Sequence, residues 1–254
     1  MKVITLSNQK GGVAKTTTAI ALATGLYHRG YTVLCIDLDP QCNLSLGVGA
    51  DVINMNNTLY DVFKGNADIN DAINHVSLGF DLITGSLMLA TADMEFTEIG
   101  REYLLKETLE PLQDKYDYCV IDTSPSLGVL VANALTASDS VVIPVTADLF
   151  ALQGLVQLHK LIQSVKKRSN HDLEIEGLLI TRHDERTNIG KALLNKIHSV
   201  ADDMGVKVFD TCIRNSVAVR ECQLKGEDIF TEIPKANATQ DYKSFINEIL
   251  EGDK

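Results

Sequence analysis

Two lysines, two glycines and two threonines stand close together near the start of the chain, in the sequence K-G-G-V-A-K-T-T at residues 10–17. Gly11 and Gly12 carry no Cβ, so the backbone there can curl and point successive N–H groups at a phosphate. Lys15 adds a full positive charge for β- and γ-phosphates, and the hydroxyl of Thr16 is a ligand that Mg²⁺ takes in nucleotide sites. These residue types at this spacing predict a loop that binds the phosphates of a nucleoside triphosphate together with magnesium.

The elements on either side of this segment are those that a phosphate-binding loop requires. A short apolar run at residues 3–6 is typical of a buried strand, and the helix-forming residues 19–23 open a helix. A strand, a loop and a helix in this order form a P-loop, in which the helix N-terminus adds its partial positive charge. The residues predicted to contact the nucleotide are Gly11, Gly12, Val13, Ala14, Lys15, Thr16 and Thr17.

The match to the common pattern G-x-x-x-x-G-K-[ST] is incomplete, because Gln9 and Ala14 occupy the two glycine positions. An alanine at position 14 fits if the backbone φ there is negative, and it costs stability or function if φ is positive. The plainer interpretation is a glycine turn that only joins a strand to a helix. The aspartates further along the chain favour the nucleotide site.

Three aspartates come directly after predicted buried strands. Asp37 and Asp39 follow the apolar run 33–36, and Asp122 follows the run 118–121. Open α/β sheets bind their ligands at the carboxyl ends of the strands. An apolar strand that ends in a carboxylate beside a P-loop is the Walker B pattern, so Asp122 is predicted to face the Mg²⁺. Taken alone, each aspartate could instead cap a turn.

The glycine segment, with its early Lys10, resembles the deviant Walker A motif K-G-G-x-G-K-[ST] of the ParA/MinD family of ATPases, from which Ala14 departs. The resemblance to ParA/Soj-type partition ATPases covers nearly the whole chain. It rests on further segments in the family's order, namely D-L-D-P-Q (37–41), V-I-D-T-S-P-S-L-G (120–128), R-T-N (186–188) and I-R-N-S-V-A-V-R-E (213–221).

The resemblance implies an enzyme that hydrolyses ATP with Mg²⁺, slowly when no partner protein is present. It implies a homodimer that forms on ATP binding, with the nucleotides at the interface and Lys10 of each chain reaching the phosphates held by the other. Asp39 is then expected to position the attacking water, and Asp37 to lie near the metal. The predicted catalytic residues are Lys10, Lys15 and Asp39, and the predicted metal site consists of Thr16, Asp37 and Asp122.

The resemblance also implies that the ATP-bound dimer binds DNA without sequence preference, and that a ParB-type protein stimulates hydrolysis. The predicted DNA contacts are Arg186, Arg214 and Arg220. They fall within residues 160–225, which carry 12 Lys/Arg against 9 Asp/Glu in a chain of net charge −11. Each arginine could instead be a surface ion-pair partner. The family contacts the adenine base near I-R-N, which leaves Arg214 ambiguous and makes Asn215 a candidate for that contact.

Composition and patterning predict the fold class. The chain has 254 residues, of which 45% are hydrophobic and 22% charged, and we expect a single domain over residues 1–254. Strand and helix patterns alternate, so the predicted fold is α/β, a doubly wound, mostly parallel sheet flanked by helices, as in P-loop NTPases. Residues 43–74 are expected to form loops and short helices, and residues 87–116 to be helical.

Cysteine usage and hydropathy bear on the compartment. The five cysteines form no C-x-x-C pair, which indicates reduced thiols and neither a disulfide framework nor a metal site. The chain runs straight into its first strand, so we expect no signal peptide, and no apolar run is long enough to span a bilayer. We therefore expect a cytoplasmic, nucleoid-associated protein with no membrane partner.

Three other functions are compatible with a deviant loop. A MinD-like positioning ATPase uses a basic amphipathic C-terminal helix as a membrane anchor, whereas this chain ends in F-I-N-E-I-L-E-G-D-K. A redox ATPase resembling the nitrogenase iron protein needs cysteines in interface loops, whereas Cys35 and Cys119 fall in predicted strands. A nucleotide switch that regulates a protein partner, with hydrolysis impaired by Ala14, is the third.

Overall fold

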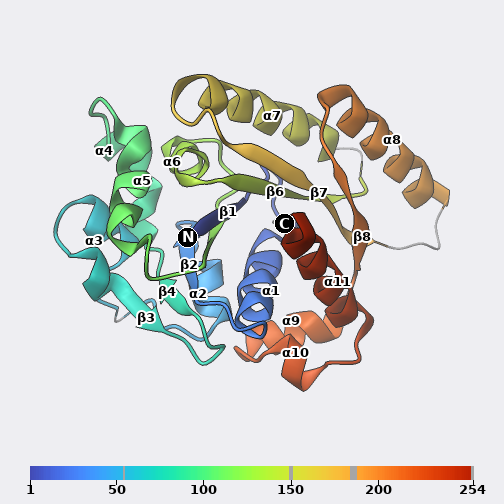
Figure 1. The fold of residues 1–254 in the computed structure, drawn as a ribbon, viewed down its shortest axis with the longest axis horizontal. Helices are drawn as coiled ribbons and strands as arrows, with labels where there is room; N and C mark the ends of the chain where they lie inside the picture. The colour runs from blue at the N-terminus through green and yellow to red at the C-terminus, as the bar shows by residue number, and fades with distance from the viewer. Residues whose placement is uncertain (54, 149–150, 184–187, 253–254) are drawn as a thin grey trace.

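The computed structural model describes residues 1–53, 55–148, 151–183 and 188–252, and the strands in these ranges form one eight-stranded sheet (Figure 1). The strand order is β3-β4-β2-β5-β1-β6-β7-β8, and every neighbouring pair is parallel except β3 with β4. The strands are β1 (Lys2–Leu6), β2 (Val33–Leu38), β3 (Ile73–His75), β4 (Asp81–Ile83), β5 (Tyr118–Thr123), β6 (Ser140–Thr146), β7 (Glu174–His183) and β8 (Val208–Arg214).

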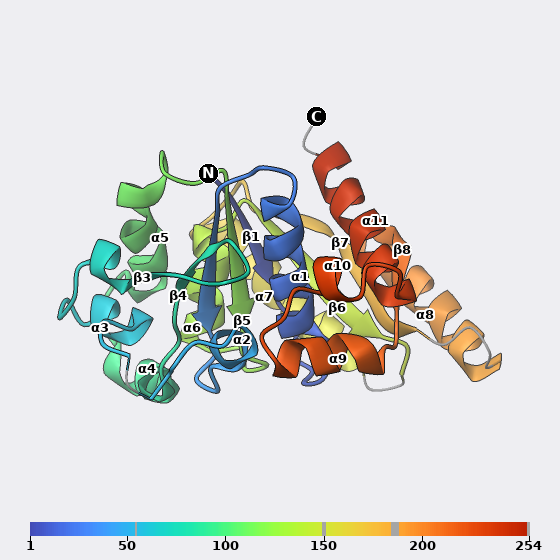
Figure 2. The same cartoon turned by 90° about the horizontal axis from the view of Figure 1, so that it is seen from below.

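Helices cover both faces of this sheet, as predicted for a doubly wound fold (Figures 1 and 2). One face carries α1 (Lys15–Tyr27), α2 (Asn43–Gly47), α9 (Val217–Leu224), α10 (Ile229–Glu232) and α11 (Asn237–Gly252). The other face carries α3 (Leu59–Phe63), α5 (Leu104–Leu109), α6 (Val129–Ala137), α7 (Ala151–Arg168) and α8 (Asn188–Met204).

The central strands are buried on both sides, which explains their continuous apolar sequences. Every residue of β2 and of β5 is buried, and their register places Asp37 directly beside Asp122. On the other side of β5, Leu6 at the end of β1 is also paired with Asp122. The P-loop and these two aspartates therefore meet at one point on the carboxyl edge of the sheet.

Two expectations about secondary structure need correction. Residues 43–74 were expected to lack strands, but they contain most of β3, which pairs with β4 as the antiparallel edge of the sheet. Residues 87–116 are helical only in pieces: the first helical stretch ends at Glu95, residues 96–100 are not helical, and Gly100 there has a left-handed φ of 86°. The pieces are η2 (Leu87–Thr91), α4 (Ala92–Glu95), η3 (Arg101–Tyr103), α5 and η4 (Glu110–Leu112).

The five cysteines are free thiols, and four of them are buried, including Cys35 and Cys119 within their strands. Within the described ranges, no helix combines the length and the apolar composition that crossing a bilayer requires.

Candidate nucleotide site

The backbone of the P-loop turns left-handed at two positions. Gly12 has φ 75°, a conformation that costs glycine little, and Ala14 has φ 63° and ψ 30°. Of the two cases that the sequence left open for Ala14, the positive φ is therefore the one present. A left-handed alanine costs roughly 1–2 kcal/mol, because its Cβ crowds the following carbonyl oxygen. Helix α1 begins directly after it, at Lys15.

The side chains of Lys15 and Thr16 make different contacts at the start of α1. The Lys15 ammonium donates to the backbone carbonyl of Lys10, at 3.3 Å, and so lies along the inside of the loop. Burial lowers the pKa of Lys15, while the charges of Asp122 and Asp39 raise it. The Thr16 hydroxyl donates to Oδ2 of Asp122 at 2.6 Å, which joins the P-loop to the end of β5.

Asp122 is the most unusual carboxylate of the site. It is fully buried, and its Oδ1 has no hydrogen-bond partner among the described residues. Burial first, and then the charge of Asp37, raise the pKa of Asp122 to about 8. A buried carboxylate with an unused oxygen and a threonine hydroxyl beside it provides the hard oxygen ligands that Mg²⁺ prefers. The residues present therefore fit a magnesium ion.

No group of three or more His, Cys, Asp or Glu side chains in the described part of the chain is arranged to hold a metal ion. Magnesium at nucleotide sites does not need such a group, because it keeps several waters and takes one or two carboxylates together with the phosphates. The pair of Thr16 and Asp122 is sufficient for this type of site.

Asp37 and Asp39 organise the turn after β2. Oδ2 of Asp37 accepts bonds from the backbone N–H and the hydroxyl of Ser45, at 2.8 and 2.7 Å, and its Oδ1 accepts from the Asp39 N–H. Burial raises the pKa of Asp37 to about 6. Asp39 is only 7% exposed, and its Oδ1 accepts the N–H of Gln41 at 2.9 Å. Neither carboxylate contacts Thr16 directly, so their predicted roles toward metal and water stay predictions.

Lys10 is held on its own chain. Its backbone N–H donates to Oδ1 of Asn8 at 2.9 Å, and the Asn8 amide in turn donates to the carbonyl of Pro144 at 2.7 Å. Its ammonium contacts the carboxylate of Asp148, which follows β6. The side chain of Lys10 is about one-third exposed, so it lies at the rim of the site.

Sequence reasoning missed several residues that surround the loop. Asp148 holds Lys10, Gln223 on α9 accepts the Thr17 hydroxyl at 3.0 Å, and Thr181 and Arg182 donate to loop carbonyls. Three of these four stand at or just after the carboxyl ends of β6 and β7. The rule that pointed to Asp37 and Asp122, applied to every predicted parallel strand, would have found them.

The structure describes two of the three predicted DNA contacts. Arg186 lies outside the described residues. The guanidinium of Arg214 forms a two-pronged ion pair with Asp241 on α11, through Nε at 2.9 Å and Nη2 at 2.5 Å. Arg220 is exposed on α9, and Asn215, the candidate adenine contact, is exposed at the end of β8. Arg214 was predicted either to contact DNA or to form a surface ion pair, and the structure contains the ion pair.

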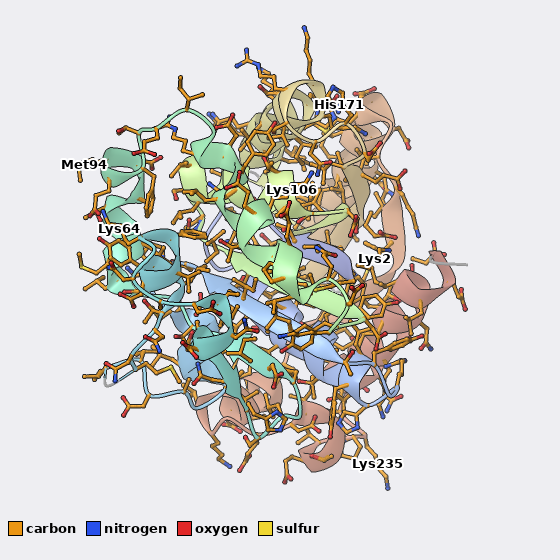
Figure 3. All side chains as sticks on the ribbon, turned by 60° about the vertical axis from the view of Figure 1, so that its left-hand side comes forward. Lys2, Lys64, Met94, Lys106, His171 and Lys235 are labelled. Carbon is orange, nitrogen blue, oxygen red and sulfur yellow. The ribbon has the colours of Figure 1, made fainter. Side chains whose placement is uncertain are left out.

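Several large apolar side chains are exposed on elements along this edge of the molecule. Helices α2, α4 and α9 lie along the same edge as the start of α1 in Figure 2, and Met94 of α4 points outward at the periphery in Figure 3. Exposed apolar residues that share one edge of a protein are candidates for an interaction surface. The exposed residues are Leu46, Leu87, Met94, Val217 and Leu224.

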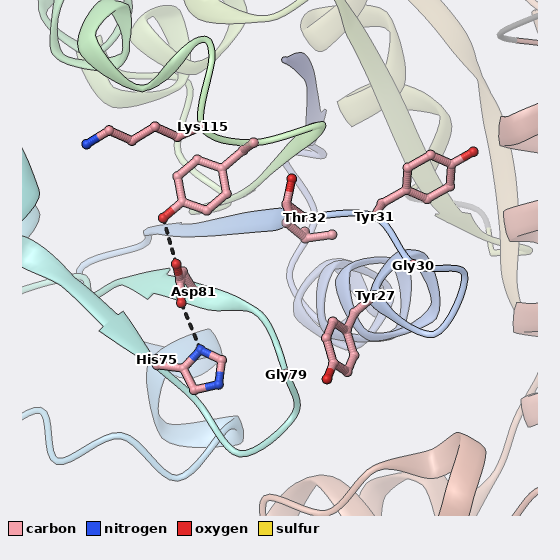
Figure 4. Close-up of a pocket in the computed structure, with 10 residues that line it drawn as sticks. Tyr27, Gly30, Tyr31, Thr32, His75, Gly79, Asp81 and Lys115 are labelled. Carbon is pink, nitrogen blue, oxygen red and sulfur yellow. Dashed lines mark hydrogen bonds and ion pairs between the residues drawn. The ribbon is translucent and has the colours of Figure 1, made fainter.

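A pocket with a volume of about 400 Å³ lies at the opposite edge of the sheet, near the starts of β2, β4 and β5 (Figure 4). Its polar groups bind one another: Asp81 accepts from the hydroxyl of Tyr116 at 2.7 Å and pairs with His75 at 2.9 Å. The ammonium of Lys115 donates to Asn70. These contacts pair the charged groups of the pocket, and none of the residues that line it belongs to the P-loop.

Comparison with known proteins identifies the family. The family described as an AAA domain, AAA_31, matches residues 1–175. The chain is 40% identical to the sporulation initiation inhibitor protein Soj of Bacillus subtilis, over 98% of each chain. It is 36% identical to the chromosome partitioning protein ParA of Caulobacter vibrioides, over 100% of this chain and 96% of that protein.

Solved structures give the same relationship. Cobyrinic acid a,c-diamide synthase from Mycobacterium smegmatis, with a bound ATP analogue and magnesium, superposes with a TM-score of 0.89 at 31% identity, covering 100% of this chain and 96% of that one. A plasmid partition protein of Borrelia burgdorferi bound to AMPPNP gives a TM-score of 0.84 at 30% identity, with 99% of both chains covered. The chain therefore belongs to the ParA/Soj family of P-loop ATPases.

Proposed function

We propose that this protein is a partition ATPase, which hydrolyses ATP with Mg²⁺ and uses the nucleotide to control binding to DNA. The observation that carries the proposal is the bond from Thr16 to Asp122, whose second oxygen is buried and unpaired beside the P-loop. Support comes from the relatives, since one related structure holds an ATP analogue with magnesium and others are named for chromosome or plasmid partition.

In the proposed reaction, each group of the loop has one task. The N–H groups of Gly11 to Val13 and the ammonium of Lys15 neutralise charge on the phosphates. Thr16 and Asp122 hold the magnesium, which supplies further positive charge at the phosphates. Asp39 positions the attacking water, and Asp37 holds the turn that presents Asp39 through its bonds to Ser45.

We propose that the active form is a homodimer closed over ATP. The exposed apolar residues along the P-loop edge support a contact surface there. Lys10 lies at the rim of the same edge, about one-third exposed, which suits a lysine that reaches the nucleotide of a second chain. In the single chain its charge is held by Asp148, so the change of partner is part of dimerisation.

We propose that DNA is bound through phosphates by Arg186 and Arg220, with a ParB-type protein as the stimulating partner, in a cytoplasmic protein that associates with the nucleoid. Exposure of Arg220 supports its role. Arg214 contributes less, because its charge is neutralised by Asp241. Asn215 is proposed to contact the adenine base of the nucleotide. Binding of this kind falls steeply as salt rises, since counterions are released from DNA.

The first test is DNA binding by the purified protein with ATP, ADP or no nucleotide, over a salt series. We expect binding in the ATP state only, with a steep loss at higher salt. Lys15→Ala should abolish the nucleotide dependence, and Arg220→Met should weaken binding while Arg168→Met, at the far end of α7, leaves it unchanged. An ATP-induced dimer that binds no DNA at any salt would refute the DNA role and point to a switch that acts on a protein.

A further inference from the structure

The carboxyl end of β7 lies against the outer side of the P-loop and donates two hydrogen bonds to it. The hydroxyl of Thr181 donates to the carbonyl of Val13 at 3.0 Å, and Nη1 of Arg182 donates to the carbonyl of Gly12 at 3.0 Å. The two bonds therefore go to the carbonyl oxygens of consecutive peptide units within the glycine segment.

Peptide geometry gives these bonds a consequence for phosphate binding. The carbonyl of one residue and the N–H of the next belong to one planar unit and point in opposite directions. Fixing the Gly12 carbonyl outward therefore fixes the Val13 N–H inward, and fixing the Val13 carbonyl does the same for the Ala14 N–H. Inward N–H groups are what a phosphate loop offers its anion.

Backbone strain marks the same place. Arg182 has φ 54°, in the left-handed region, although it is neither glycine nor asparagine. Ala14, at the other end of the braced segment, is also left-handed. Strained residues persist where the surrounding structure requires them, and they concentrate at functional sites. Thr181 next to it is fully buried, so the strand end that carries Arg182 is anchored.

We propose that Thr181 and Arg182 are positioning residues, which hold the Val13 and Ala14 N–H groups toward the nucleotide's phosphates. The inference rests on the proposed nucleotide site. Arg182 holds the Gly12 carbonyl more firmly than an uncharged donor would, because hydrogen bonds from charged groups are stronger. The Gly11–Ala14 segment lies beside the phosphates that ATP and ADP share, so the effect is equal for the two nucleotides.

The test measures the dissociation constants of Mg·ATP and Mg·ADP for the wild type, Arg182→Met, Arg182→Lys and Thr181→Val. Arg168→Met is the matched control, since Arg168 is an exposed arginine at the far end of α7. We expect Arg182→Met to weaken both nucleotides by the same factor, about 5- to 20-fold. Lysine should restore part of the loss, because it keeps a charged donor but not the planar fork. Thr181→Val should weaken both to a smaller extent, and the melting temperature of nucleotide-free Arg182→Met should match the wild type.

Other outcomes overturn the inference. Loss of ATP affinity with unchanged ADP affinity would place Arg182 on the γ-phosphate instead of on the loop. Unchanged affinity for both nucleotides, or failure of lysine to restore any of the loss, would remove its positioning role. A wild type that binds neither nucleotide would refute the proposed function itself, which is a separate result.

Discussion

The ammonium of Lys10 is paired with the carboxylate of Asp148 in the same chain, across the mouth of the P-loop. Asp148 also accepts the hydroxyl of Thr146 at 2.5 Å, so it is fixed at the end of β6. Lys10 thus has a partner before any second chain arrives. For Lys10 to reach a nucleotide in another chain, this pair must open.

Asp148→Asn should therefore favour the ATP-bound dimer. Each side chain of the pair is about one-third exposed, and such pairs are worth about 0.2–1 kcal/mol. Because two such pairs open for each dimer, the dimer constant should rise by roughly 2- to 30-fold. Sedimentation or light scattering with ATP, at low salt, measures the shift. Asp172→Asn, at an exposed aspartate after α7, is the control. A weaker dimer in Asp148→Asn would mean that Asp148 helps the dimer form.

Asp39→Ala should separate nucleotide binding from hydrolysis. Asp39 lies beside the site without contacting Thr16, so affinity for Mg·ADP should stay within about twofold. Hydrolysis should fall by about 100-fold, because a positioned water is lost. Single-turnover hydrolysis measures the rate, and titration with Mg·ADP measures the affinity. Equal losses of rate and of affinity would instead mean that Asp39 maintains the structure of the loop.

Ala14→Gly should stabilise the protein, which is unusual for a glycine substitution at the start of a helix. The left-handed φ of 63° favours glycine by roughly 1–2 kcal/mol, and the greater freedom of the unfolded chain offsets about 0.4–1 kcal/mol of this. Thermal unfolding should show a rise of about 1–4 °C. In contrast, Ala192→Gly inside α8 should lower the melting temperature. A lower melting temperature for Ala14→Gly would mean that Ala14 is not strained in the folded protein.

Stability without nucleotide should decrease as the pH rises from about 5 to 8. The folded state raises the pKa of Asp37 to about 6 and that of Asp122 to about 8, above the usual 3.8. The folded state therefore binds more protons than the unfolded state in this range, and raising the pH favours unfolding. Thermal unfolding across this range measures the slope. Asp122→Asn should make the dependence of stability on pH less steep. Mg²⁺ with nucleotide should reverse its direction, because the ion binds the ionised carboxylate.

The carboxyl-edge rule explains how much of the site could be predicted from the sequence. Lys15, Thr16 and Asp122 could be predicted because a glycine loop and a strand-terminal aspartate have local signals, and the structure joins Thr16 to Asp122. The sheet and its parallel order followed from alternating strand and helix patterns, whereas β3 escaped because it is a three-residue edge strand.

Contacts between distant segments could not be predicted in the same way. Arg214 has the sequence of a basic surface residue, and only the packing of α11 brings Asp241 to it. The role of Arg182 could not be predicted for the same reason, because its bond to Gly12 joins residues that are 170 positions apart. The sequence left the sign of φ at Ala14 open, because no local pattern separates a strained alanine from a normal helix start.

Helix α11 lies against α1 so closely that a Cβ on Gly25 would come within 2.2 Å of the Ile246 side chain. The fully buried face of α11, with Tyr242, Phe245 and Ile246, therefore packs in one core with α1, the helix that follows the P-loop. On the ribosome, α1 emerges more than two hundred residues before this partner. During synthesis, the side of α1 that α11 covers therefore stays without this partner until α11 has been made.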